Sequence, residues 1–252
     1  MKLKKSDRII SGGVPIILLV IWELCSRVGI IDVRFFPPPS AIFVRMWDLA
    51  ESGELLHHTL VTCRRLLVGF FVGGIPALLL GVLAGLYRPF YLAFNPLVSA
   101  TYPIPKSAIY PLILLIFGLG EMSKVAMVAM GVFYPLFINT QAGVANIQRI
   151  YLDVGENYRA DRWQVIYTIA LPGALPSIIS GVKLGLGLGL ILIAIAEMIG
   201  SNDGIGFMIW NAWQILSIET MFVGLMVVAI IGFLLTALAD EMERRIVPWK
   251  QS

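Results

Sequence analysis

The sequence predicts an all-α membrane protein with about six transmembrane helices. Of its 252 residues, 58% are hydrophobic and only 14% are charged, and the mean hydropathy is +0.84. A soluble domain of this length cannot bury so much apolar surface. The apolar residues form continuous runs of about 20 residues, which suit membrane-spanning helices, rather than the alternating pattern of a transmembrane β-strand.

Six apolar segments are long enough to cross a bilayer. The first follows a basic N-terminal stretch and has no small-residue cleavage site after it, so we expect it to be retained. The third contains prolines at positions 96, 103, 105 and 111, which predicts a kinked or broken helix. The predicted spans are residues 12–29, 66–87, 92–118, 124–145, 174–199 and 219–240.

The distribution of Lys and Arg predicts that both termini lie in the cytoplasm. Basic residues concentrate on the cytoplasmic side of membrane proteins, and this orientation gives that side the larger share. It places residues 146–172 in the cytoplasm and residues 30–65 and 200–218 outside. The cytoplasmic set is Lys2, Lys4, Lys5, Arg8, Arg88, Arg149, Arg159, Arg162, Arg244, Arg245 and Lys250, and the outer set is Arg34, Arg45, Arg64, Arg65 and Lys124.

We expect one membrane domain without an energy source of its own. Residues 1–65 would supply the first span and an outer amphipathic segment, and residues 66–245 the core with a cytoplasmic loop at about 146–172. The sequence lacks the G-x-x-x-x-G-K-[ST] loop that wraps nucleotide phosphates. The glycines at 181, 185, 187 and 189 lie inside an apolar span and favour close helix packing instead. The net charge of +3 reflects the topological bias and gives no support for nucleic-acid binding.

A polar, charge-mixed segment at 153–176 stands between two of these apolar spans. It has helix-forming composition and ends in the pattern L-P-x-x-L-P, where the next span begins. Apolar side chains within it can fill a groove on a partner protein, while the charges around them set the orientation of the segment in that groove. A solvated interfacial helix without a partner is the alternative. The L-P element consists of Leu171, Pro172, Leu175 and Pro176.

This segment resembles the cytoplasmic E-A-A loop of ABC importer permeases of the binding-protein-dependent type, whose pattern is roughly E-A-A-x-x-x-G followed by an L-P element. Further motifs along nearly the whole chain look like the nitrate, sulfonate and taurine branch of that family. They are Pro37-Pro38-Pro39-Ser40, Pro103-Ile104-Pro105-Lys106, Phe117-Gly118-Leu119-Gly120, Ala196-Glu197-Met198-Ile199-Gly200, Gly204-Ile205-Gly206-Phe207 and Glu243-Arg244-Arg245.

The resemblance implies a type I ABC importer permease in the bacterial inner (plasma) membrane. ABC ATPase subunits would bind ATP and Mg outside this chain, and their closure would pull two such loops together. An extracytoplasmic binding protein would deliver the solute, and a second copy of the chain would complete a homodimer. No cofactor or metal is expected in the chain itself. The coupling residues implied by the match are Asp153, Val154, Gly155, Glu156, Tyr158, Arg159, Ala160, Asp161, Arg162 and Trp163.

The loop departs from the family pattern in two places. The E-A-A triplet is replaced by Asp153-Val154-Gly155, and the usual glycine by Arg159. Because a side chain disfavours positive φ, we expect the turn at Arg159 to be looser or differently placed. Arg159 could also contact a partner carboxylate.

Ionisable residues within spans are functional candidates, because burying their charge in a membrane is costly. Lys183 and Glu197 would lie within about 40° on one helix face and roughly 21 Å apart, which could mark a pathway-facing stripe. Lys106 could lend positive potential to a cavity for an anion, or else snorkel toward an interface or pair with a glutamate. For Glu197 we favour a gate or helix-end hydrogen-bonding role. Glu23 can pair with Arg27 one turn later.

The outer segment from Pro39 to Thr62 has the pattern of an amphipathic helix, with His57 and His58 near its end. Adjacent residues point about 100° apart on a helix, and no third ligand accompanies them, which disfavours a zinc site. We interpret the two histidines as surface residues near a docking partner.

Three classes of function are consistent with a polytopic chain. An intramembrane enzyme would need paired catalytic groups, which the candidates do not form. An ion-coupled carrier or channel would leave the 146–172 loop without a purpose. We therefore expect a permease subunit for a small oxyanion such as nitrate, a sulfonate including taurine, or bicarbonate. A neutral or aromatic precursor is the alternative within the same branch.

Overall fold

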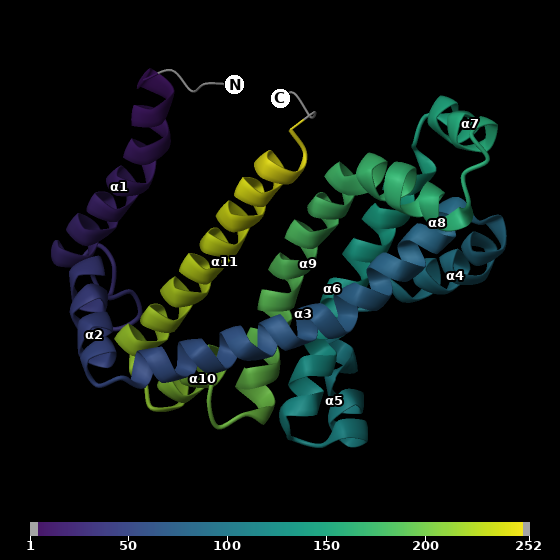
Figure 1. The fold of residues 1–252 in the computed structure, drawn as a ribbon. Helices are drawn as coiled ribbons and strands as arrows, with labels where there is room; N and C mark the ends of the chain where they lie inside the picture. Colours follow the sequence, from purple (N-terminus) through teal and green to yellow (C-terminus); the bar gives the residue numbers. More distant parts are fainter. Residues whose placement is uncertain (1–4, 249–252) are drawn as a thin grey trace.

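The computed structural model describes residues 5–248, with side chains from Gly13 onward, and this part of the chain is built from helices (Figure 1). Four of these helices are long and apolar enough to cross a membrane. They are α3 (Glu54–Leu86), α6 (Glu121–Ala145), the continuous run ending in α9 (Leu171–Gly200), and α11 (Ile218–Ile246). They correspond to the second, fourth, fifth and sixth predicted spans.

The third predicted span is a bent pair of helices, as its prolines indicated. α4 (Arg88–Thr101) and α5 (Lys106–Phe117) meet at an angle of 102° and would count together as a fifth span. Pro103 and Pro105 lie in the break, where Pro cannot donate the helical hydrogen bond. The first predicted span, 12–29, overlaps α1 (Lys5–Arg27).

The core consists of α3, α6 and α9, and small residues let these helices approach closely. A Cβ added at Gly73 of α3 would lie 2.2 Å from the carbonyl oxygen of Ala129 in α6. A Cβ at Gly181 of α9 would lie 2.9 Å from Cβ of Asn139. At Gly187 of α9, by contrast, a Cβ would have no neighbour within 4 Å. The prediction of close packing therefore holds for Gly181 and not for Gly187.

The outer segment differs from its prediction. The helix expected from Pro39 to Thr62 is interrupted by a turn, in which Gly53 has φ of 79°. α2 (Pro39–Glu51) ends before this turn, and α3 begins directly after it at Glu54 rather than near residue 66. The boundary expected at 65/66 lies inside α3.

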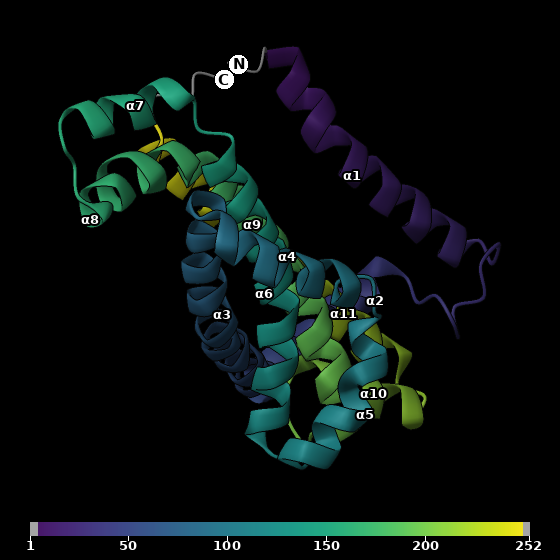
Figure 2. The same ribbon diagram turned by 90° about the vertical axis from the view of Figure 1, so that its right-hand side faces the viewer.

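α1 stands apart from the core helices, and only its C-terminal end comes close to α2 (Figures 1 and 2). Glu23 pairs with Arg27 at 2.6 Å, as expected, and also accepts hydrogen bonds from Ser40 at the start of α2. Trp22 contacts Phe222 of α11, with ring centroids 5.5 Å apart.

The molecule has two distinct ends. The start of α1, the last turns of α11 and the short helix α7 (Arg149–Asn157) lie at one end (Figures 1 and 2). α5 and α10 (Ile205–Gln214) lie at the opposite end.

Candidate functional site

The segment between α6 and α9 contains a tight turn after α7. Arg159 has a positive φ of 54°. Its backbone N–H donates to the carbonyl of Glu156, and the N–H of Ala160 donates to the carbonyl of Gly155, both at 2.9 Å. This pair of bonds forms a Schellman motif, whose left-handed position is usually Gly. The expectation of a looser or displaced turn is therefore wrong, because Arg159 adopts the glycine-like conformation at a cost of about 1–2 kcal/mol.

The chain re-enters a helix through a capping box at Asp161. The Asp161 carboxylate accepts from the backbone N–H of Gln164, and the Gln164 side chain accepts from the N–H of Asp161, each at 2.8 Å. α8 (Arg162–Gln164) then continues through the π-helix η1 (Val165–Ala170) into α9. Pro172 cannot donate an α-helical bond to Thr168, which suits a wider π turn just before it. The four residues of the L-P element fall in the first turns of α9, where the span begins.

Residues 149–170, which we call the α7–η1 unit, hold apolar side chains outward. Tyr158 is 84% exposed and Trp163 is 67% exposed. Trp163 stacks on Tyr167 with ring centroids 6.2 Å apart. Gly155 is buried against η1, since a Cβ there would come within 2.8 Å of Cδ1 of Ile169. Ile150, Tyr151 and Val154 are further exposed apolar residues of the unit.

The ten residues expected to couple the chain to an ATPase lie together in this unit. Gly155 is buried and Ala160 is half-buried, while the other eight are exposed. Asp153 is 3.8 Å from Arg149, in an exposed pair one helical turn apart. The charged side chains therefore surround an exposed apolar surface and leave it open to contact.

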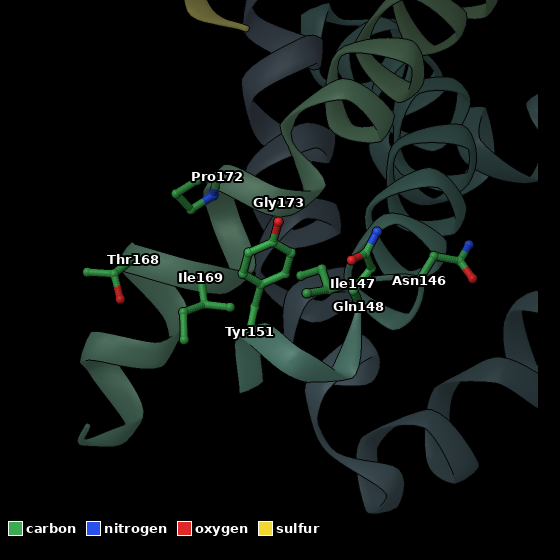
Figure 3. A pocket seen from close by; sticks show the side chains of 8 residues that line it. All are labelled: Asn146, Ile147, Gln148, Tyr151, Thr168, Ile169, Pro172 and Gly173. Atoms are coloured by element: carbon green, nitrogen blue, oxygen red, sulfur yellow. The ribbon is translucent and has the colours of Figure 1, made fainter. Parts of the chain in front are cut away.

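Two pockets flank the unit. The first, of about 510 Å³, lies between α7, η1 and the start of α9, with the ring of Tyr151 among its lining side chains (Figure 3). The second, of about 460 Å³, lies between the junction of α3 with α4 and the start of α8. The first is lined by Asn146, Ile147, Gln148, Tyr151, Thr168, Ile169, Pro172 and Gly173, and the second by Leu83, Tyr87, Pro89, Phe90, Arg162, Trp163 and Ile166.

Lys106 holds the bend between α4 and α5. Its ammonium donates to the carbonyls of Thr101, Tyr102 and Ile104 at 2.8, 2.9 and 3.0 Å. The same nitrogen lies 4.1 Å from the centroid of the Tyr134 ring in α6. An ammonium has three N–H donors, so these carbonyls account for all of them.

Lys183 of α9 joins α11 through an ion pair with two carboxylates. Its ammonium nitrogen is 2.5 Å from Oδ1 of Asp240 and 2.5 Å from Oε2 of Glu243. The Lys183 side chain is 23% exposed, whereas Glu197, the other end of the expected stripe, is fully buried.

Glu197 lies in a network of hydrogen bonds near the end of α9. Its carboxylate accepts from Arg65 Nη1 at 2.9 Å, from the Thr62 hydroxyl at 2.8 Å, and from the backbone N–H of Gly206 at 3.0 Å. This arrangement fits the helix-end role that the sequence favoured for Glu197. Arg65 also pairs with Glu121 of α6 and with Asp203.

Sequence reasoning missed Arg65 and Thr62 and misplaced His58. The sequence predicts Arg65 in an outer loop, yet it is 2% exposed inside α3. His58 is 7% exposed, and its Nδ1 accepts from the backbone N–H of Gly204 at 3.0 Å, so its interpretation as a surface residue is wrong. The signal was helical spacing, because residues 58, 62, 65, 69 and 73 follow one face that continues into the glycines of the span.

Comparisons with known proteins agree with this architecture. Residues 77–248 match the family model described as "Binding-protein-dependent transport system inner membrane component". The putative aliphatic sulfonates permease SsuC of Escherichia coli is 34% identical over 96% of this chain and 92% of its own length. The taurine permease TauC of the same organism is 30% identical over 95% of this chain and 89% of its own.

A nitrate import permease and a solved structure extend the comparison. NrtB of Synechocystis is 29% identical over 98% of this chain and 92% of its own length. The MetNI methionine ABC transporter, in an inward-facing conformation, has a chain that matches with a TM-score of 0.69 at 18% identity. That match covers 79% of this chain and 98% of the other, and it shows the fold alone.

Proposed function

The chain belongs to the family of inner membrane components of binding-protein-dependent transport systems, and from this premise we propose that it imports a small oxyanion. It is a permease subunit of an ABC importer and not an enzyme.

The exposed apolar surface of the α7–η1 unit is the main support for an ATPase partner. Tyr158, which caps the C-terminus of α7, and Trp163 in α8 are well exposed, although a Schellman motif and a capping box fix the backbone around them. Large aromatic side chains presented in this way are typical anchors of protein interfaces. We assign them to a groove on an ATPase subunit, which would bind ATP and Mg in place of this chain.

The position of the unit supports a cytoplasmic site. α7 lies at the same end of the molecule as the start of α1 and the last turns of α11 (Figure 1). Both termini are expected in the cytoplasm from the distribution of Lys and Arg. The opposite end, with α5 and α10, would then face an extracytoplasmic binding protein. Because one chain supplies one such unit, a second copy would complete a homodimer.

Two observations bear on the solute, namely the names of the relatives and the partners of one buried and two half-buried cations. The three relatives are named for sulfonates, taurine and nitrate, which share a compact group of anionic oxygens. Within the described chain, Lys106, Lys183 and Arg65 bind internal carbonyls or carboxylates. Recognition of the anion would therefore rest mainly on the binding protein, while this chain supplies a path.

Purification and reconstitution test the proposal. The tagged chain, isolated from its native membrane, should bring an ATPase with it, and Tyr158→Ala with Trp163→Ala should release that ATPase. Trp213→Ala, which removes an exposed aromatic at the opposite end, is the matched control. Uptake into proteoliposomes should favour nitrate or sulfonates over neutral aromatic solutes. Isolation of the chain without an ATPase, or release by the control alone, would contradict the proposal.

A further inference from the structure

The first turn of α10 is held by side chains of other helices. The N–H of Gly204 donates to His58 Nδ1 at 3.0 Å, and that of Ile205 to the Thr62 hydroxyl at 2.8 Å. The N–H of Gly206 donates to Oε2 of Glu197 at 3.0 Å. These are donors that a helix leaves unpaired at its start, and the N-cap residue of α10, Gly204, has no side chain with which to satisfy them. α3 and α9 thus cap α10 from outside, and a carboxylate faces the positive end of its dipole.

Arg65 ties this cap to the surrounding helix ends. Nε and Nη2 donate to Glu121, Nη1 donates to Glu197 and to the backbone carbonyl of Asp203, and Nη2 also donates to the Asp203 carboxylate. A guanidinium has five N–H donors in a fixed plane, and these contacts occupy all of them. Lys has three donors and could not reproduce the arrangement.

Close backbone contacts leave α10 little room to tilt. A Cβ at Gly204 would lie 2.2 Å from Cδ of Glu197, and a Cβ at Gly206 would lie 2.1 Å from the carbonyl oxygen of Ala194. Ile205 is fully buried and Met208 is 3% exposed. The polar cap and the apolar contacts therefore hold the same helix in one orientation.

Resting on the proposed transport function, we propose that Arg65 is a positioning residue that fixes α10 to α3 and α9, so that these helix ends move as one rigid body when the outer end of the pathway opens. Separating a buried, hydrogen-bonded ion pair leaves uncompensated charge in the interior, which is strongly unfavourable. Opening is thus expected at the boundaries of this body and not across the contact between α3 and α10.

Hydrogen exchange on the purified chain tests the positioning role directly. Arg65→Gln should raise amide exchange in residues 204–214 by about 100-fold or more, because the buried Glu197 loses its charged partner. Arg64→Gln is the matched control, since Arg64 shares Glu121 at 2.9 Å but does not bind Glu197 or Asp203. Unchanged exchange in the Arg65 variant, or an equal rise in the control, would overturn the inference. This readout does not require transport.

A cross-link tests the rigid-body motion. The rings of His58 in α3 and Phe207 in α10 are 6.0 Å apart, so cysteines at both positions could be joined by a short, reducible bifunctional thiol reagent. Cys25 and Cys63 would be replaced by Ala. Because His58→Cys removes the acceptor of the Gly204 N–H, each protein is compared only with itself before the reagent is added. With Arg65 present, cross-linking should leave the uptake of this protein unchanged. In the Arg65→Gln background, cross-linking should raise uptake toward the level of the protein with Arg65.

The outcomes separate this inference from the proposed function. If the protein transports before cross-linking and not after it, α10 must leave α3 during transport, and the rigid body is wrong while the importer stands. If cross-linking fails to raise uptake in Arg65→Gln, the positioning role is wrong. A wild-type complex without uptake of any tested solute would overturn the proposed function instead.

Discussion

The backbone N–H of Ala160 binds the carbonyl oxygen of Gly155 at 2.9 Å, and this bond closes the end of α7 around a left-handed Arg159. The side chain of Arg159 is exposed, so it does not contribute to the hydrophobic core in return for the strained backbone. Strained backbone of this kind is often found at functional sites, and here it is consistent with a contact between Arg159 and a partner protein.

Arg159→Gly should make the turn more stable by about 1 kcal/mol, because Gly adopts positive φ without a Cβ penalty. Amide exchange of residues 155–160 should slow accordingly. Arg162→Gly, in a right-handed helix, should have the opposite effect and serves as the control. Faster exchange in Arg159→Gly would mean that the Arg side chain stabilises the turn through contacts of its own.

Replacing Asp153 and Glu156 with Lys should leave the chain inserted but weaken its association with the ATPase or uncouple hydrolysis from uptake. Both side chains are exposed on the α7–η1 unit, so the reversal alters the rim of the expected interface rather than the fold. Asp48→Lys with Glu51→Lys makes the same charge change on α2, away from the unit. Normal solute-stimulated ATPase activity in the first double variant would exclude this unit as the coupling element.

Gly181→Ala should lower the thermal unfolding midpoint, whereas Gly187→Ala should not. A Cβ at position 181 would lie 2.9 Å from Cβ of Asn139 and 3.1 Å from Cα of Leu136. To relieve this overlap, α9 would have to move away from α6. Overpacking of this kind costs about 1–3 kcal/mol. Position 187 is open, so Ala there brings only its higher helix propensity, worth about 1 kcal/mol. Equal midpoints for the two variants in detergent would contradict the helix contact.

Asp203→Asn should reduce stability at neutral pH and have little effect at low pH. Burial raises the pKa of Asp203, but hydrogen bonds from Arg65 and Ser201 lower it by a larger amount. The pKa of Asp203 therefore lies below its ordinary value of 3.8. A lowered pKa gives stability that is present above 3.8 and is lost as the pH falls through the folded-state value. The difference in unfolding midpoint between wild type and Asp203→Asn should therefore be constant from about pH 7 to 5 and shrink below 3.8.

Asp48→Asn, an exposed neutralisation on α2, controls for the change in overall charge. A difference between wild type and Asp203→Asn that grows as the pH falls would show that the Asp203 carboxylate does not stabilise the folded chain through Arg65.

Local sequence signals predicted much of the fold. Pro103 and Pro105 indicated the break that appears as the 102° bend between α4 and α5. The L-P element indicated the start of α9, and the polar segment before it folds as short helices with exposed aromatic residues. These features depend on neighbouring residues and on the missing N–H of Pro, which a sequence displays directly.

Contacts between distant residues could not be predicted in this way. A hydropathy profile places Arg65 in a loop, because burying an unpaired charge is costly. In the structure this cost is offset by three carboxylates that lie 56, 132 and 138 positions later in the chain, and a hydropathy profile does not detect such distant partners. The left-handed conformation of Arg159 was also not predicted. Its residue type disfavours positive φ, and the backbone hydrogen bonds that close the turn around it are seen only in the folded structure.

The saturated guanidinium of Arg65 also has a genetic consequence. Thr62 and Arg65 both donate to the carboxylate of Glu197, so a substitution at any of the three leaves the others with unmet partners. A side chain at Gly204 or Gly206 would disturb the same carboxylate, because an added Cβ would lie 2.2 Å from Cδ or 2.8 Å from Cβ of Glu197. Damage from a second substitution among them should therefore add little to the first. In a mutational scan, single and double substitutions at these positions should therefore cause similar losses of function. Related sequences that differ at one of these positions should tend to differ at the others as well.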